Sequence, residues 1–165
     1  MEAFGGMHAV GYRDAMAEIE AINAGLALAP TCEPLVMPPR RAFDRLNAMG
    51  IRWVQLSATQ RGMRPRELDQ SARRDLLATL RRRELSVSGV DAWIPATHYA
   101  DEQHSDRAAA AIMATIDLAG DLGRCPVSVT WPAEGAEEVI ELAATRAEHV
   151  GEPITDHAVP VSQIG

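Results

Sequence analysis

The chain has 165 residues, of which 47% are hydrophobic and 24% charged, as expected for one globular domain with a buried core. No apolar stretch approaches the ~20 residues of a membrane span, and the first residues lack the basic and apolar regions of a signal peptide. Its formal net charge is -7, and all 16 basic residues are arginine, which excludes lysine Schiff-base and P-loop chemistry. We therefore expect a cytoplasmic protein with no membrane partner.

The arginines are concentrated in one part of the chain. Residues 38–84 contain 12 arginines and only 5 acidic residues, whereas the rest of the chain is acidic. We interpret Arg73, Arg74 and residues 81–83 as the solvated face of one helix, with an anionic ligand or partner as the alternative. Nucleic acid is disfavoured as a partner because no nucleic-acid motif or aromatic platform accompanies the arginines. The two cysteines, Cys32 and Cys125, are far apart and are expected to be buried free thiols.

Helices and strands are predicted in strict alternation along the chain. Residues 1–11 read as a loose terminus and 12–23 as a first helix. Strands are then predicted at 26–29, 53–57, 85–91, 126–130 and 154–155. Helices are predicted at 39–49, from 71 to the low 80s, from 105 or 106 to 123, and at 137–150, with loops at 31–39, 60–69 and 92–104.

Apolar residues at helical spacing predict which faces are buried. Phe43, Leu46 and Met49 define the first of these faces, and Gly50 follows as a helix-ending glycine. Ser71 is the predicted cap of the next helix. The other residues expected to face inward are Leu76, Leu77, Leu80, Ala109, Ile112, Met113, Ile116, Ala119, Val139, Ile140, Ala143 and Ala147.

Five strands separated by helices indicate an α/β protein with a parallel sheet. No Gly-x-Gly-x-x-Gly motif follows a strand, which disfavours a dinucleotide-binding domain, and no Gly-x-Ser-x-Gly elbow is present. A flavodoxin-like open sheet and a segment of a (β/α)8 TIM barrel both fit. In either fold, polar residues at the carboxyl ends of the strands are the first candidates for a site.

Three stretches resemble the sugar phosphate isomerase/epimerase family, the xylose-isomerase-like TIM barrels. They are Ala-Met-Gly-Ile-Arg-Trp-Val-Gln-Leu-Ser-Ala at 48–58, Leu-Ser-Val-Ser-Gly-Val-Asp at 85–91, and His-Tyr-Ala-Asp at 98–101 followed by Asp-Arg-Ala at 106–108. The resemblance divides the chain into an extension at 1–25, a partial barrel at 26–158 and a tail at 159–165. It implies a fold of about five parallel strands alternating with helices, where a full barrel has eight.

The resemblance also implies a divalent-metal cofactor, such as Mn, Mg, Co or Zn, held at the ends of the later strands. Asp156 and His157 are the implied ligands at the fifth strand, although a glutamate is expected there. Gln55 stands where many relatives carry glutamate. The implied metal site is incomplete in this chain. We expect a truncated product, a fragment, or a half-barrel completed as a homo-oligomer.

Other candidate site residues follow the predicted strands. His98 and Asp101 lie in the loop after the third strand and suggest a general acid or base with a carboxylate partner, or an ordinary exposed loop. Asp91 ends that strand and suits either a sugar hydroxyl or a turn. Gln55 and Ser57 project from one face of the second strand, which suits hydrogen bonding to a polyol.

Trp93 and Trp131 follow the third and fourth strands, where an aromatic ring either stacks on a sugar or closes the end of the barrel. His104 is assigned to the surface without a role. The implied activity is isomerisation or epimerisation of a sugar or sugar phosphate by proton transfer next to a carbonyl. The alternative is a non-catalytic α/β module that binds a partner or self-assembles.

Overall fold

The computed structural model describes residues 29–156, except 102 and 152. The predicted loose terminus at 1–11, helix at 12–23, most of the strand at 26–29, the tail at 159–165 and His157 therefore lie outside the described residues. No helix in the described part is long and apolar enough to cross a membrane.

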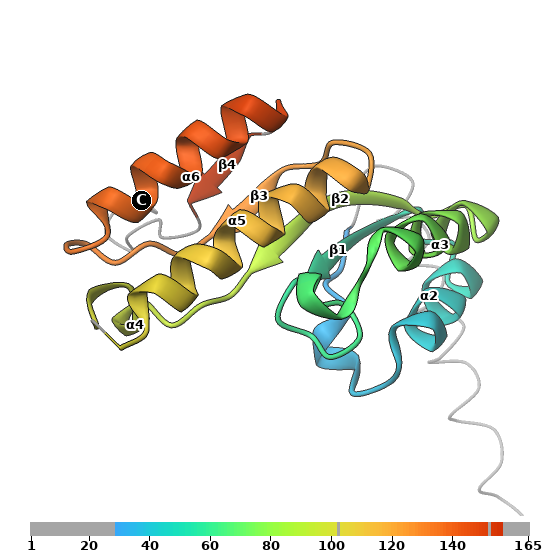
Figure 1. Ribbon diagram of the computed structural model, residues 1–165. Coiled ribbons are helices and arrows are strands. Elements are labelled where there is room, and N and C mark those ends of the chain that lie inside the picture. Colours follow the sequence, from blue (N-terminus) through green and yellow to red (C-terminus); the bar gives the residue numbers. More distant parts are fainter. Residues whose placement is uncertain (1–28, 102, 152, 157–165) are drawn as a thin grey trace, which may run out of the picture.

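The fold is built on a sheet of four parallel strands that neighbour one another in sequence order (Figure 1). They are β1 (Trp53–Ser57), β2 (Ser86–Ala92), β3 (Val127–Val129) and β4 (Ile154–Asp156). A parallel bridge joins Thr31 to Gln55, and the Gln55 amide donates to the Pro30 carbonyl oxygen at 3.1 Å. The segment before the helix predicted at 39–49 thus runs beside β1, with pairing at Pro30, which was expected to stop the strand.

Four longer helices connect or precede the strands, as predicted. They are α2 (Pro39–Ala48), α3 (Gln70–Arg82), α5 (Ser105–Asp121) and α6 (Glu137–Val150). Three short helices, η1 (Glu33–Leu35), η2 (Pro65–Glu67) and α4 (Thr97–Ala100), lie in segments predicted to be loops. Pro34 and Pro65 stand in the first turn of η1 and η2, where a fixed φ favours a helical start and no amide is lost.

Helix ends follow local chemistry, with one correction. Asp69, rather than Ser71, caps α3, because its carboxylate accepts a 2.7 Å hydrogen bond from the Ala72 amide. Gly151 ends α6 in the left-handed conformation, at φ 80°, which glycine adopts without steric cost. Ser105 begins α5, as predicted.

The core lies between the helices and one face of the sheet, and Figure 1 shows α5 lying across β2 and β3. Side chains with no exposed surface come from both layers: Phe43, Val54, Leu80, Val90, Ile112, Ile116, Val127 and Val129. Most predicted inward residues are buried, but Met49 and Ile140 are each 38% exposed. Met49 lies just after the end of α2. Ile140 lies on α6, the last of the described helices in the chain.

Both cysteines are buried free thiols, as predicted. Burial raises the pKa of Cys32 to about 11, so this thiol stays protonated at neutral pH. The Cys125 thiol lies 3.7 Å from the Ala119 carbonyl oxygen.

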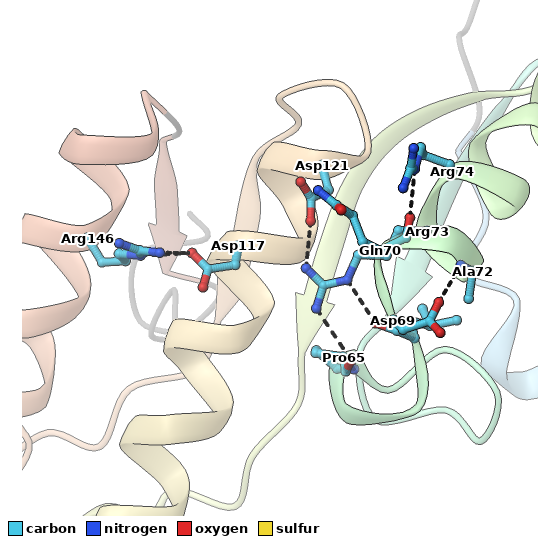
Figure 2. A network of polar contacts seen from close by, with 10 residues as sticks. Pro65, Asp69, Gln70, Ala72, Arg73, Arg74, Asp117, Asp121 and Arg146 are labelled. Carbon is cyan, nitrogen blue, oxygen red and sulfur yellow. Dashed lines mark hydrogen bonds and ion pairs between the residues drawn. The ribbon is translucent and has the colours of Figure 1, made fainter.

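Several arginines join elements instead of forming a solvated face (Figure 2). Arg73 of α3 contacts Asp121 of α5 at 2.6 Å and donates from Nε to the Leu68 carbonyl oxygen at 3.0 Å. Arg146 of α6 donates to Asp117 of α5 at 2.8 Å. The solvated-face interpretation is thus right for Arg74, which is exposed, and wrong for Arg73, whose side chain is only 17% exposed.

Candidate functional site

The sheet register aligns four polar residues in one row across the strands. Ser57 pairs with Asp91, Asp91 with Ser128, and Ser128 with Thr155. Alternation along a strand places this row on the face opposite Leu56, Val90 and Val127, which pack against the helices. We call these four residues the polar row.

The polar row is tied to η1 at one end. The Ser57 hydroxyl donates to Glu33 Oε2 at 2.8 Å and lies 2.8 Å from the Thr59 hydroxyl. At the other end, the Thr155 hydroxyl lies 3.4 Å from the Ser128 hydroxyl. Ser57 has no exposed surface and Ser128 is 8% exposed, so these hydroxyls are held in place. The row therefore presents three hydroxyls and one carboxylate on the face of the sheet opposite the helices.

Sequence reasoning found Ser57 and Asp91 but missed Glu33, Ser128 and Thr155. Glu33 follows the strand predicted at 26–29, so the strand-end rule that selected Asp91 would have found it. Ser128 lies between two fully buried valines, and this alternation marks it as facing away from the helices. Gln55 is half-buried two residues before Ser57 and shares its face, as predicted.

Asp101 has a different partner from the one predicted. Its Oδ2 lies 2.6 Å from His104 Nδ1, and its Oδ1 accepts the Gln103 amide at 2.9 Å. The amide hydrogen bond, followed by the one from His104, lowers the pKa of Asp101 below its usual range. His98 stacks on the His104 ring at 4.6 Å between centroids. His104, which was assigned to the surface, has a side chain that is 37% exposed, and a local turn brings its ring to Asp101.

The two tryptophans after the strands lie in different surroundings. Trp93 is 63% exposed, whereas Trp131 is half-buried and its ring lies 5.4 Å from that of Tyr99. Burial raises the pKa of Tyr99 to about 12, and its hydroxyl has no hydrogen-bond partner among the described residues. Trp131 thus packs against Tyr99 and the core.

A cleft of about 520 Å3 opens on the helix side of the sheet. Its walls are the loop after β1, the segment after β2 and the amino-terminal half of α5, and both His98 and Trp93 line it. Four of the predicted site residues therefore divide into two groups. Ser57 and Asp91 belong to the polar row, and His98 and Trp93 belong to the cleft on the opposite face.

A divalent cation does not fit the residues that the structure describes. They contain no group of three or more His, Cys, Asp or Glu side chains placed to hold a metal ion. The polar row offers mainly hydroxyls, whereas transition-metal sites use several imidazole or carboxylate ligands. Asp156 is exposed at the end of β4, and His157 lies outside the described residues. The implied metal ligands are thus not assembled within the described part.

Strand order separates the two folds that the sequence allowed. In a flavodoxin-like sheet the spatial order of the strands departs from their order in the sequence at a switch point. In a barrel each strand lies beside the next one along the chain. The described strands follow sequence order, with residue 31 beside β1. A crystal structure of a xylose isomerase domain protein from Planctomyces limnophilus matches 68% of this chain, with a TM-score of 0.54 and 14% sequence identity.

The chain has the fold of part of a xylose isomerase-like TIM barrel. The match spans 47% of the Planctomyces protein, so this barrel segment corresponds to about half of that chain. The sequence matches no protein-family model and no curated protein. The predicted α/β partial barrel is confirmed, with four described parallel strands.

Proposed function

We propose that the polar row binds a sugar or sugar phosphate and belongs to the active site of an isomerase or epimerase. The observation that carries this proposal is the register that aligns Ser57, Asp91, Ser128 and Thr155 on the interior face of a barrel segment. Hydroxyl and carboxylate groups at fixed positions suit the many hydroxyls of a polyol. Barrel enzymes place their substrates at the carboxyl ends of the strands.

The chemistry proposed is proton transfer next to a carbonyl. A base removes the proton from the carbon beside the carbonyl and leaves an enediolate. In isomerisation the neighbouring carbon receives the proton while the hydroxyl proton moves between the two oxygens, and in epimerisation the same carbon receives the proton on its other face. Asp91 and Glu33 are the carboxylates placed on this face, so we assign the proton transfer to them and not to His98. Ser57 positions Glu33 through the 2.8 Å hydrogen bond.

Binding and exchange measurements test this proposal. A panel of aldoses, ketoses and their phosphates is titrated into the chain by calorimetry, and exchange of the substrate proton is followed in deuterated water. Asp91→Asn is expected to lower exchange by roughly a hundredfold, as removal of a general base does. Ser86→Ala is the control, because Ser86 is exposed at the opposite end of β2. Absence of both binding and exchange across the panel contradicts the proposal.

A second candidate is a non-catalytic module that assembles with a partner or with itself. At one end of the described fold, Thr155 and Asp156 of β4 are exposed, and Leu142 on the neighbouring α6 is 52% exposed. An exposed strand beside exposed apolar side chains is a surface that a second copy could cover. Light scattering tests this candidate. A monomer at all concentrations excludes self-assembly, whereas a dimer that Leu142→Glu dissociates supports it.

A further inference from the structure

The helix-side cleft has a lining suited to an anion. Arg64, Arg66 and Arg107 line it together with His98 and His104, and no aspartate or glutamate is among the described residues that line it. Such surroundings are unusual in a chain whose net charge is -7. The cleft volume of about 520 Å3 falls within the range of small-molecule sites.

The three arginines differ in how they are held. Arg64 donates from Nε to the Thr59 carbonyl oxygen at 2.9 Å and contacts Glu67 at 3.5 Å, which fixes its guanidinium. Arg66 and Arg107 are exposed, and neither has an ion pair or hydrogen bond to another described side chain. Two guanidinium groups therefore remain available at the cleft beside one that is already positioned.

The remaining wall is apolar. Ala110, Ala111 and Ala114 of α5 form one side with short side chains, and Trp93, Ile94 and Pro95 contribute the segment after β2. Short side chains leave room next to the helix, and an indole face offers a surface for a planar ring. The cleft thus combines an anion-binding group with space for an apolar body.

We propose that this cleft binds an organic phosphate monoester that carries a ring or another apolar body. Guanidinium groups match phosphate oxygens in paired hydrogen bonds, and a dianion with three terminal oxygens can engage several of them together. The apolar body lies against the alanines and Trp93. The site is separate from the polar row, because Ala58 and Ala92 line it from the helix side of the sheet.

Phenyl phosphate is the probe that tests this site in the full chain. Calorimetry should show saturable binding of phenyl phosphate, with weaker binding of inorganic phosphate and of benzoate. The double variant Arg66→Gln/Arg107→Gln should weaken the binding of phenyl phosphate by roughly a hundredfold, about tenfold for each guanidinium–phosphate hydrogen bond that is removed. Arg41→Gln/Arg81→Gln removes the same charge from two exposed arginines that do not line the cleft and should leave the affinity within about threefold.

A cleft-filling variant tests the position of the apolar body. Ala110 is exposed on α5, so Ala110→Trp should fill the cleft without disturbing the core and should abolish phenyl phosphate binding while the melting temperature stays unchanged. Three results each overturn the proposal: no saturable binding of phenyl phosphate, equal weakening in the Arg41/Arg81 control, and equal affinity for inorganic phosphate and phenyl phosphate. The last result would mean that no organic body is recognised.

Discussion

The two halves of α5 are packed differently on their outer side. Residues 110, 114, 117 and 121 follow one another at spacings of four, three and four, so they form a single stripe along the helix. In the second half, the stripe carries Asp117 and Asp121, which pair with arginines of α6 and α3 (Figure 2). Before Asp117 it carries Ala110 and Ala114, which line the cleft.

The carboxylates on this stripe stand where ion pairs join α5 to its neighbouring helices. Where the helix supplies an aspartate, an arginine from a neighbouring helix is drawn in and the two helices are joined. Where it supplies alanine, the nearby Arg66 and Arg107 have no such partner among the described side chains and a cleft remains. The same residue type therefore serves packing at one end of α5 and, on our proposal, recognition at the other.

The largest expected effect on stability concerns the buried inner side that both halves of α5 have. Ile112 and Ile116 have no exposed surface and lie on the inner side of the first and second half. Ile112→Ala and Ile116→Ala should each lower the free energy of unfolding by about 3 kcal/mol, as buried large-to-small substitutions do. Urea denaturation measures both. A much smaller effect at Ile112 would show that the first half is also loosely packed on its inner side.

The next effect concerns the ion pair between α3 and α5. A double-mutant cycle with Arg73→Met and Asp121→Asn should give a coupling free energy of about 1 kcal/mol, at the upper end for surface pairs, because Arg73 is largely shielded. The coupling should fall in high salt. Coupling indistinguishable from zero would mean that the pair does not join the helices.

A smaller, pH-dependent effect is expected where α5 begins. The pKa of Asp101 is lowered in the folded chain, so its carboxylate favours folding at neutral pH. This contribution is lost as the pH falls below the ordinary aspartate value of 3.8 and through the lower folded value. Asp101→Asn should therefore be less stable than the parent chain at pH 7 and equally stable near pH 2. A difference that persists at low pH would assign the effect to shape instead of charge.

The smallest effect is expected at the cleft itself. Arg66→Gln and Arg107→Gln should change the free energy of unfolding by less than about 0.5 kcal/mol, because neither side chain has a described partner. Arg73→Gln is the matched comparison and should be clearly destabilising. Similar destabilisation at all three positions would remove the distinction between the two groups of arginines.

The order of helices and strands could be predicted because each has a local signature. Gly50 and Gly151 end helices, and Val127 and Val129 flank Ser128 in a strand whose valines are buried. The candidate site was harder to predict from the sequence, because it depends on which strands pair and in what register. The row from Ser57 to Thr155 joins residues almost a hundred positions apart, and no local pattern relates them.

Side-chain partners were the least predictable. Asp101 was expected beside His98, but a short turn gives it His104 as its hydrogen-bond partner. Arg73 was expected in solvent, but α5 passes close enough for Asp121 to reach it. In both cases, the deciding distance depends on how two segments approach, which composition and periodicity do not specify.

The consecutive strand order has a consequence for how the chain folds. Each strand pairs with the next one along the chain, so each pairing closes a loop that holds one longer helix and its connecting segments. Such a sheet can grow one helix-strand unit at a time as the chain leaves the ribosome, because no strand must wait for a distant partner. We expect β1 and β2, which share the longest pairing, to form the nucleus to which β3 and then β4 are added.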